Sequence, residues 1–159
     1  MMETQILSGQ KAVGDPYLHL KIDSETQILL PIETTQEVLI TDANRLTVMP
    51  NMLPFFLGLL NQRSHIFWII DLGEFLELSP LKSDVQQYSI AVIRAGKKAI
   101  GLATEKVKGV TRLPVEEIQS PIGKVKDSLI PYLKGCTTEN EQILLVLDAE
   151  AILNAPILQ

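Results

Sequence analysis

The residues of this chain whose types could support nucleophilic catalysis are Ser64 and His65, with Asp71 a short distance further along. A serine, a histidine and an aspartate form a catalytic triad when their three side chains converge. Neighbouring side chains on an extended strand point to opposite faces, which disfavours a direct hydrogen bond between Ser64 and His65. The sequence therefore assigns no catalytic residue, and a small β-barrel hydrolase that uses His65 and Asp71 stays an alternative interpretation.

Motifs that bind phosphate, nucleotides or metals are absent from the sequence. The 159 residues contain no GxxxxGK[ST] loop, no GxSxG elbow and no HExxH motif. Cys136 is the single cysteine, which excludes an internal disulfide and a cysteine-based zinc cluster. Two histidines, His19 and His65, are too few for a histidine-rich metal site. We therefore expect no cofactor, no metal and no enzymatic activity.

The charge and hydropathy of the chain exclude several classes of partner. The net charge is -5 at pH 7, with 14 Lys and Arg against 19 Asp and Glu, so there is no excess of positive charge for a nucleic-acid backbone. The longest apolar runs, 55–60 and 66–70, are far shorter than the roughly 20 residues of a membrane-spanning helix. The N-terminus lacks the apolar run of a signal peptide. We expect a cytoplasmic protein without membrane insertion.

Short apolar runs separated by polar turns dominate the sequence, and they predict an all-β protein. Three pairs of runs have the pattern of β-hairpins, namely 17–22 with 28–32, 88–94 with 97–103, and 133–137 with 142–147. Three further strands are expected at 37–41, 65–71 and 107–113. Many short strands at this spacing are typical of a barrel or a sandwich.

Helical signals are few and short. Asn51 is expected to cap a turn that begins near Pro54, and a single turn is expected over 71–76. The clearest helix is near the C-terminus, at 149–153, with Asp148 as its N-cap.

The recurrence of the hairpin pattern suggests two small barrels built on similar lines. The polar segment 79–86 is the expected linker between them, and 1–16 is expected to be a polar extension before a domain at 17–154. A barrel of about 70 residues has a marginal core of its own, so two such barrels would gain stability by packing their apolar faces together.

The order of these segments resembles the CheW family of chemotaxis adaptors. The matching stretches are LPIETTQEVLI at 30–40, MPNMLPFFLGLLNQRSHIFWIIDL at 49–72, IGLATEKVKGVTRLPVEEI at 100–118, and the closing pair 133–135 and 144–153. The second stretch is similar to the family signature of a proline-rich turn, a short helix ending in glycine, an Asn-Leu-Arg-Gly turn and a strand ending in Asp-Leu. The positions that match this signature are Pro50, Pro54, Gly58, Asn61, Arg63, Asp71 and Leu72.

Three departures distinguish this chain from the family pattern. The family's Leu-Arg-Gly is Gln62-Arg63-Ser64 here, the proline of the next strand is Trp68, and the valine-aspartate pair is Thr104-Glu105. Losing the glycine restricts φ in the turn, so a different turn shape is expected. The departures suggest a divergent member, from a pilus-motility or phototaxis pathway.

The resemblance implies a fold of two intertwined five-stranded barrels on a shared hydrophobic core, with no catalytic activity. It implies an adaptor that couples the helical tip of methyl-accepting receptors to the regulatory domain of a CheA-type histidine kinase. A kinase-regulating competitor with other partners is the alternative within the same class.

By position, the resemblance makes Glu37, Val38, Asn61 and Arg63 the candidate partner-binding residues. Each of the last three also has a structural interpretation. Val38 could be a core residue, Asn61 a turn residue, and Arg63 part of an ion pair at the rim of a barrel.

Overall fold

The computed structural model describes residues 13–158. The predicted N-terminal extension at 1–16 therefore lies outside the described residues, except for its last four. Of these four, Asp15 and Pro16 already belong to the first strand.

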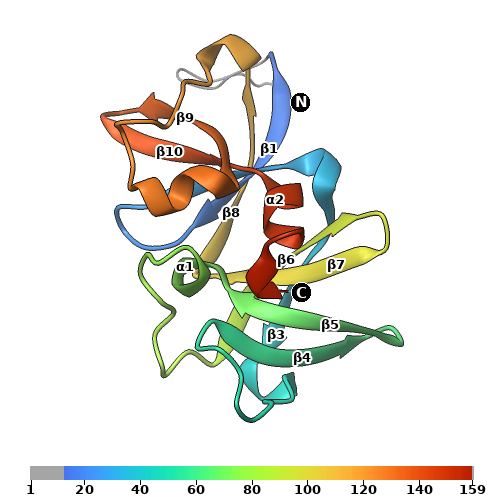
Figure 1. Cartoon of the computed structure of the whole chain (residues 1–159). Helices are drawn as coiled ribbons and strands as arrows, with labels where there is room; N and C mark the ends of the chain where they lie inside the picture. The colour runs from blue at the N-terminus through green and yellow to red at the C-terminus, as the bar shows by residue number, and fades with distance from the viewer. Residues whose placement is uncertain (1–12, 159) are drawn as a thin grey trace.

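Two five-stranded sheets form the framework of the described chain, which confirms the predicted all-β, two-barrel fold (Figure 1). The first sheet has the order β8-β1-β2-β10-β9 and the second has the order β3-β6-β7-β5-β4. The strands of the first sheet are β1 (Asp15–Lys21), β2 (Gln27–Pro31), β8 (Lys106–Leu113), β9 (Leu133–Glu139) and β10 (Gln142–Leu147). Those of the second are β3 (Thr35–Asp42), β4 (Phe56–Gln62), β5 (His65–Asp71), β6 (Gln87–Ala95) and β7 (Lys98–Thr104).

Short helices and 3₁₀ turns connect the strands. The α-helices are α1 (Leu72–Phe75) and α2 (Ala149–Leu153), and the 3₁₀ turns are η1 (Ile32–Thr34), η2 (Ala43–Arg45), η3 (Val115–Glu117), η4 (Asp127–Tyr132) and η5 (Pro156–Leu158). Both α-helices begin with an aspartate cap. The Glu74 N–H donates to Asp71 Oδ1 at 3.2 Å, and the Ala151 N–H donates to Asp148 Oδ1 at 3.1 Å. None of the helices within 13–158 has the length and apolar character needed to cross a membrane.

The chain passes between the two sheets twice, so the barrels are intertwined. It leaves the first sheet after β2, forms all five strands of the second sheet, and returns at β8. The crossings are η1 and Glu105. The segment 79–86, expected as the linker, joins α1 to β6 within the strands of the second sheet. Its polar composition marks a loop, but composition carries no information on which strands pair across that loop.

The two sheets repeat one design. Each edge strand, β3 or β8, is followed by a 3₁₀ turn and then by a residue that closes the barrel. Thr47 exchanges backbone hydrogen bonds of 2.8 and 2.9 Å with Leu59, and Gln119 does so with Cys136 at 2.8 and 2.9 Å. Strand β3 therefore corresponds to β8, β4 to β9, β5 to β10, and α1 to α2.

A shared core joins the barrels, as the resemblance implied. Its largest cluster includes fully buried side chains from both sheets, among them Leu20, Ile28, Leu30, Ile70, Ile93 and Leu102. Helix α2 lies between the sheets and adds Ile152 to the same cluster (Figure 1). Separate smaller clusters fill the interior of each barrel.

The turn expected near Pro54 is present, since the Phe56 N–H donates to the Leu53 carbonyl oxygen at 3.0 Å. It does not continue as a helix, because residues 56–62 form strand β4. Asn51 does not cap a helix; it takes a left-handed φ of 60° in a turn. Gly58, expected at the end of a short helix, lies inside β4 with φ of 144°, and a Cβ there would stand 2.5 Å from the Thr47 carbonyl oxygen. A continuous apolar run has no visible period, so the sequence does not distinguish a strand from a helix there.

Candidate functional site

The hydrolase interpretation is contradicted by the positions of His65 and Asp71. His65 is exposed at the first position of β5, and Asp71 is buried at its last. Five residues of strand lie between them, and the six steps from His65 to Asp71 span roughly 20 Å at the rise of a β-strand. Ser64 lies in the turn beside His65. The three side chains therefore do not converge.

The carboxylate of Asp71 has a structural role instead. While Oδ1 caps α1, Oδ2 accepts a 2.8 Å hydrogen bond from the Leu81 N–H, and this holds the loop at 79–86 against the helix. Burial raises the pKa of Asp71, and the hydrogen bonds from backbone N–H groups oppose that rise.

The four candidate partner-binding residues lie on edge strand β3 and around the turn between β4 and β5. That turn consists of Arg63 and Ser64, with left-handed φ values of 53° and 68°. The equivalent turn in the first sheet, Asn140 and Glu141, has φ values of 50° and 66°. Paired positive φ is the geometry of tight β-hairpins. Ser64 adopts a φ that glycine favours, so losing the glycine strains this turn without opening it.

The structure brings two of the four candidates together. Arg63 Nη1 lies 3.9 Å from Glu37 Oε1, so the turn is linked to strand β3. The Arg63 side chain is 78% exposed and that of Glu37 is 22% exposed. An ion pair this exposed contributes less than about 1 kcal/mol to stability. It places the guanidinium near β3 and adds little to the stability of the fold.

The other two candidates do not join the ion pair. Val38 is 43% exposed, so its interpretation as a core residue is wrong. Because side chains alternate along a strand, it points away from the face that carries Glu37, as the exposed Ile40 also does. Asn61 is exposed and belongs to β4, just before the turn.

Sequence reasoning missed Arg45, which connects the two strands of this surface. Its Nη1 donates to Thr41 Oγ1 at 3.3 Å and its Nη2 to the Asn61 carbonyl oxygen at 3.2 Å. Arg45 therefore links β3 to β4 beside the bridge that closes the barrel. It lies in a short 3₁₀ turn, and no motif marks it.

A second missed residue is Val110, the exposed counterpart of Val38. The two valines stand at equal distances in sequence before Thr47 and Gln119, the residues that close the two barrels. The sequence signal for Val110 is that Gly109-Val110 occupies the position of Glu37-Val38 in the other barrel. This equivalence can be recognised once the two barrels are aligned.

The residues of this surface are arranged to bind a partner, and they do not converge on a reaction centre. Among the described residues, no group of three or more His, Cys, Asp or Glu is placed to hold a metal ion. His19 lies in β1 and hydrogen-bonds to the Gln27 side chain across the hairpin. Burial lowers the pKa of His19. What remains on the surface is the apolar face of β3 with Val38 and Ile40, and the exposed guanidinium of Arg63 near Glu37.

Comparison with known proteins gives two matches. Residues 16–156 match the family described as the CheW-like domain. The fold is similar to the crystal structure of the scaffolding protein TtCheW from Thermoanaerobacter tengcongensis, with a TM-score of 0.73 and 18% sequence identity. That similarity covers 86% of this chain and 90% of the other chain. No curated protein sequence gives a significant match.

Proposed function

Because the chain belongs to the CheW-like domain family, we propose that it is a non-enzymatic adaptor that couples methyl-accepting chemoreceptors to a CheA-type histidine kinase. The observation that supports this most is the extent of the family match, which includes both barrels and the whole surface around Glu37 and Arg63.

The exposed face of β3 is the proposed receptor contact. Val38 and Ile40 are exposed apolar side chains on one face of an edge strand. Arg63 lies 3.9 Å from Glu37, whose side chain points to the other face of that strand. An amphipathic helix could bury these two apolar side chains against the strand. A helical receptor tip has this chemistry.

The kinase contact is proposed to be one barrel against another. The resemblance implies that the regulatory domain of the kinase has this same fold, and two similar barrels can associate with pseudosymmetry. The departures at Ser64 and Trp68 are the reason to propose a divergent pathway, in twitching motility or phototaxis, for this adaptor.

The test is binding of the purified chain to two proteins of its own organism, the regulatory domain of a CheA-type kinase and a cytoplasmic receptor fragment. Calorimetry is expected to detect binding to both. Val38→Asp should weaken receptor binding at least about tenfold, because it places a charge in an apolar contact. Val115→Asp, at a well exposed position in η3 beside the other sheet, is the matched control and should bind normally.

The outcomes separate the adaptor from its alternative. Binding to the kinase without the receptor would favour a kinase-regulating competitor. Binding to neither protein would contradict both roles. Equal losses from Val38→Asp and Val115→Asp would contradict the contact surface and leave the coupling role itself standing.

A further inference from the structure

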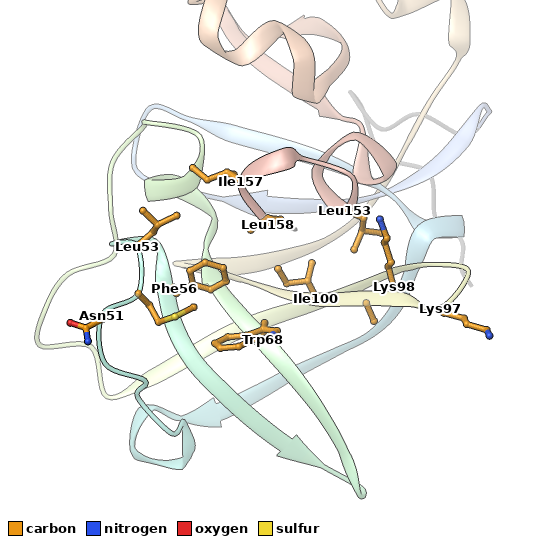
Figure 2. A pocket seen from close by; sticks show the side chains of 12 residues that line it. Asn51, Leu53, Phe56, Trp68, Lys97, Lys98, Ile100, Leu153, Ile157 and Leu158 are labelled. Atoms are coloured by element: carbon orange, nitrogen blue, oxygen red, sulfur yellow. The ribbon is translucent and has the colours of Figure 1, made fainter.

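A cavity of about 560 Å³ lies between the second sheet and the C-terminal part of the chain. Its floor is aromatic, because the rings of Phe56 and Trp68 pack edge to face with their centroids 5.2 Å apart. Figure 2 shows Leu153 and Leu158 on the opposite side, above Phe56 and Trp68. The lining shares no residue with the proposed receptor contact. Small-molecule sites are typically apolar hollows of roughly 300–1,000 Å³, and this cavity has that size and character.

The polar groups of the cavity are at its rim, and one end is cationic. Lys97 lies in the turn between β6 and β7 and Lys98 is the first residue of β7, while Leu53 and Asn51 lie at the other end (Figure 2). Lys98 Nζ donates to Asn154 Oδ1 at 3.0 Å, which holds the ammonium beside the apolar wall, whereas Lys97 extends outward. Two adjacent lysines form a local positive region in a chain of net charge -5.

The equivalent cavity of the first sheet has acidic groups at its rim. It has a volume of about 480 Å³ and lies between β10, the loop before β9, the β1–β2 turn and the segment after α1. Glu25 occupies the turn position that corresponds to Lys97, and Glu141 also lines this cavity, together with Lys126. The two barrels therefore have equivalent cavities whose rims differ in charge. The lysines at the rim of the cavity lined by Trp68 favour an anionic ligand there.

We propose that the cavity lined by Phe56 and Trp68 binds a small molecule with an aromatic or branched apolar body and one carboxylate, the carboxylate lying at Lys98. The apolar body covers the two rings, and the carboxylate meets the ammonium at the rim. This site is separate from the receptor contact and goes beyond the adaptor function.

The tryptophan of the cavity provides the measurement. Trp68 is the only tryptophan of the chain, so its indole N–H gives a single side-chain signal of that type in a ¹H–¹⁵N spectrum. The probes are naphthalene-1-acetate and its uncharged analogue naphthalene-1-acetamide, which have the same ring and nearly the same shape. We expect the acetate to shift the Trp68 signal with a dissociation constant of about 0.1–1 mM, given the affinity per atom of small ligands. The acetamide should bind about three- to tenfold more weakly.

Two variants test the role of the lysine. Lys98→Gln should weaken binding of the acetate about three- to tenfold, the range expected for a partly exposed ion pair, and leave the acetamide unchanged. Lys106→Gln removes the same charge on β8, away from the cavity, and should bind both probes as the unmodified protein does. An unshifted Trp68 signal in the free Lys98→Gln protein checks that the cavity keeps its shape.

Several results would overturn the proposal. The Trp68 signal could stay unmoved by either probe at millimolar concentrations. The two probes could bind equally well, or Lys98→Gln and Lys106→Gln could have equal effects. If the Trp68 signal moves only with protein concentration, or only when the kinase domain is added, the cavity is a contact for another protein and not a small-molecule site.

Discussion

At the scale of single residues, the turn between β4 and β5 combines strain with recognition. Arg63 and Ser64 both hold a left-handed φ, which a side chain resists because its Cβ approaches the neighbouring carbonyl oxygen. The register of β4 with β5, from Phe56 opposite Ile70 to Gln62 opposite His65, imposes that conformation. The backbone pairing of β4 with β5 therefore holds the turn in its strained conformation.

Ser64→Gly should stabilise the protein. Glycine removes the steric cost of the left-handed φ, and the entropy of the unfolded chain offsets part of this, which leaves about 0.5–1 kcal/mol. Thermal unfolding should show a higher Tm. Ser24→Gly, in an exposed turn where the structure has no positive φ, is the control and should lower the Tm slightly. A lower Tm for Ser64→Gly would contradict the strained turn.

Arg63→Ala should separate binding from stability. The exposed ion pair with Glu37 contributes less than about 1 kcal/mol, so the Tm should change little. A charge-assisted hydrogen bond to a partner is worth about 1.5–3 kcal/mol, so we expect receptor or kinase affinity to fall by about 10- to 100-fold. Arg112→Ala, which removes a guanidinium from β8, is the control. Unchanged affinity for both partners would leave Arg63 only the structural role at the barrel rim.

At the scale of elements, one unit occurs twice: a strand, an aspartate cap and a short helix. Strand β5 leads through Asp71 to α1, and β10 leads through Asp148 to α2. The two caps differ in their second oxygen, since Asp71 Oδ2 also accepts from the Leu81 N–H. The extra bond holds the loop before β6, so the first helix has a wider structural role than its four residues suggest.

The buried carboxylate of Asp71 should make stability depend on pH. Burial raises its pKa above the ordinary value of 3.8, so the folded state binds a proton at a higher pH than the unfolded chain does. The stability from this protonation is fully present below pH 3.8 and is lost as pH rises through the raised pKa. The unfolding free energy relative to Asp71→Asn should therefore fall with rising pH across that window, as measured by urea denaturation.

Asp148→Asn is the control for this titration. That variant keeps Asp71. Its unfolding free energy, relative to that of the double variant with Asp148→Asn and Asp71→Asn, should therefore fall with rising pH in the same way. A difference between the unmodified protein and Asp71→Asn that stays constant from pH 3.5 to 7 would contradict the raised pKa.

Gly58→Ala should test why β4 can pass close to Thr47. The φ of 144° is unfavourable for alanine, and the new Cβ would meet the Thr47 carbonyl oxygen at 2.5 Å. Gly109→Ala is the matched control, since its φ is 130° but nothing lies within 4 Å of the added Cβ. We expect Gly58→Ala to destabilise the protein by at least about 1 kcal/mol more than Gly109→Ala, because the close contact adds to the backbone strain. Equal losses in urea denaturation would contradict the contact.

At the scale of the whole molecule, the two barrels depend on each other. The chain forms the second sheet between two halves of the first, and the largest core cluster has side chains from both. Neither barrel can therefore unfold without exposing the apolar face of the other. This coupling keeps the proposed receptor contact and the cavity beside α2 in fixed relative positions.

We expect one cooperative unfolding transition for both barrels. Ile152→Ala, in the shared core, should cost about 2–5 kcal/mol and lower hydrogen-exchange protection in both sheets together. Ile122→Ala, at a well exposed position, should change stability little. Two separate transitions, or lost protection in one sheet only, would contradict a shared core.

Short-range patterns in the sequence predict most of the hairpins and the C-terminal helix. Alternation predicts the hairpins that appear as β1 with β2, β6 with β7, and β9 with β10, because side-chain period and turn residues are properties of short segments. The cap at Asp148 and its helix follow from equally local chemistry. The four ordered motifs indicated the family, which the match over 16–156 confirms.

The tertiary structure decided everything that depends on which segments meet. It made residues 56–62 a strand, placed the crossings at η1 and Glu105, and brought Arg63 to Glu37. It also set Phe56 and Trp68 beneath the chain that follows α2, which creates the cavity. These features come from barrel closure and from contacts between residues far apart in the chain. A local pattern constrains the shape of a segment, but the partner of that segment is set by the burial of apolar surface across the whole fold.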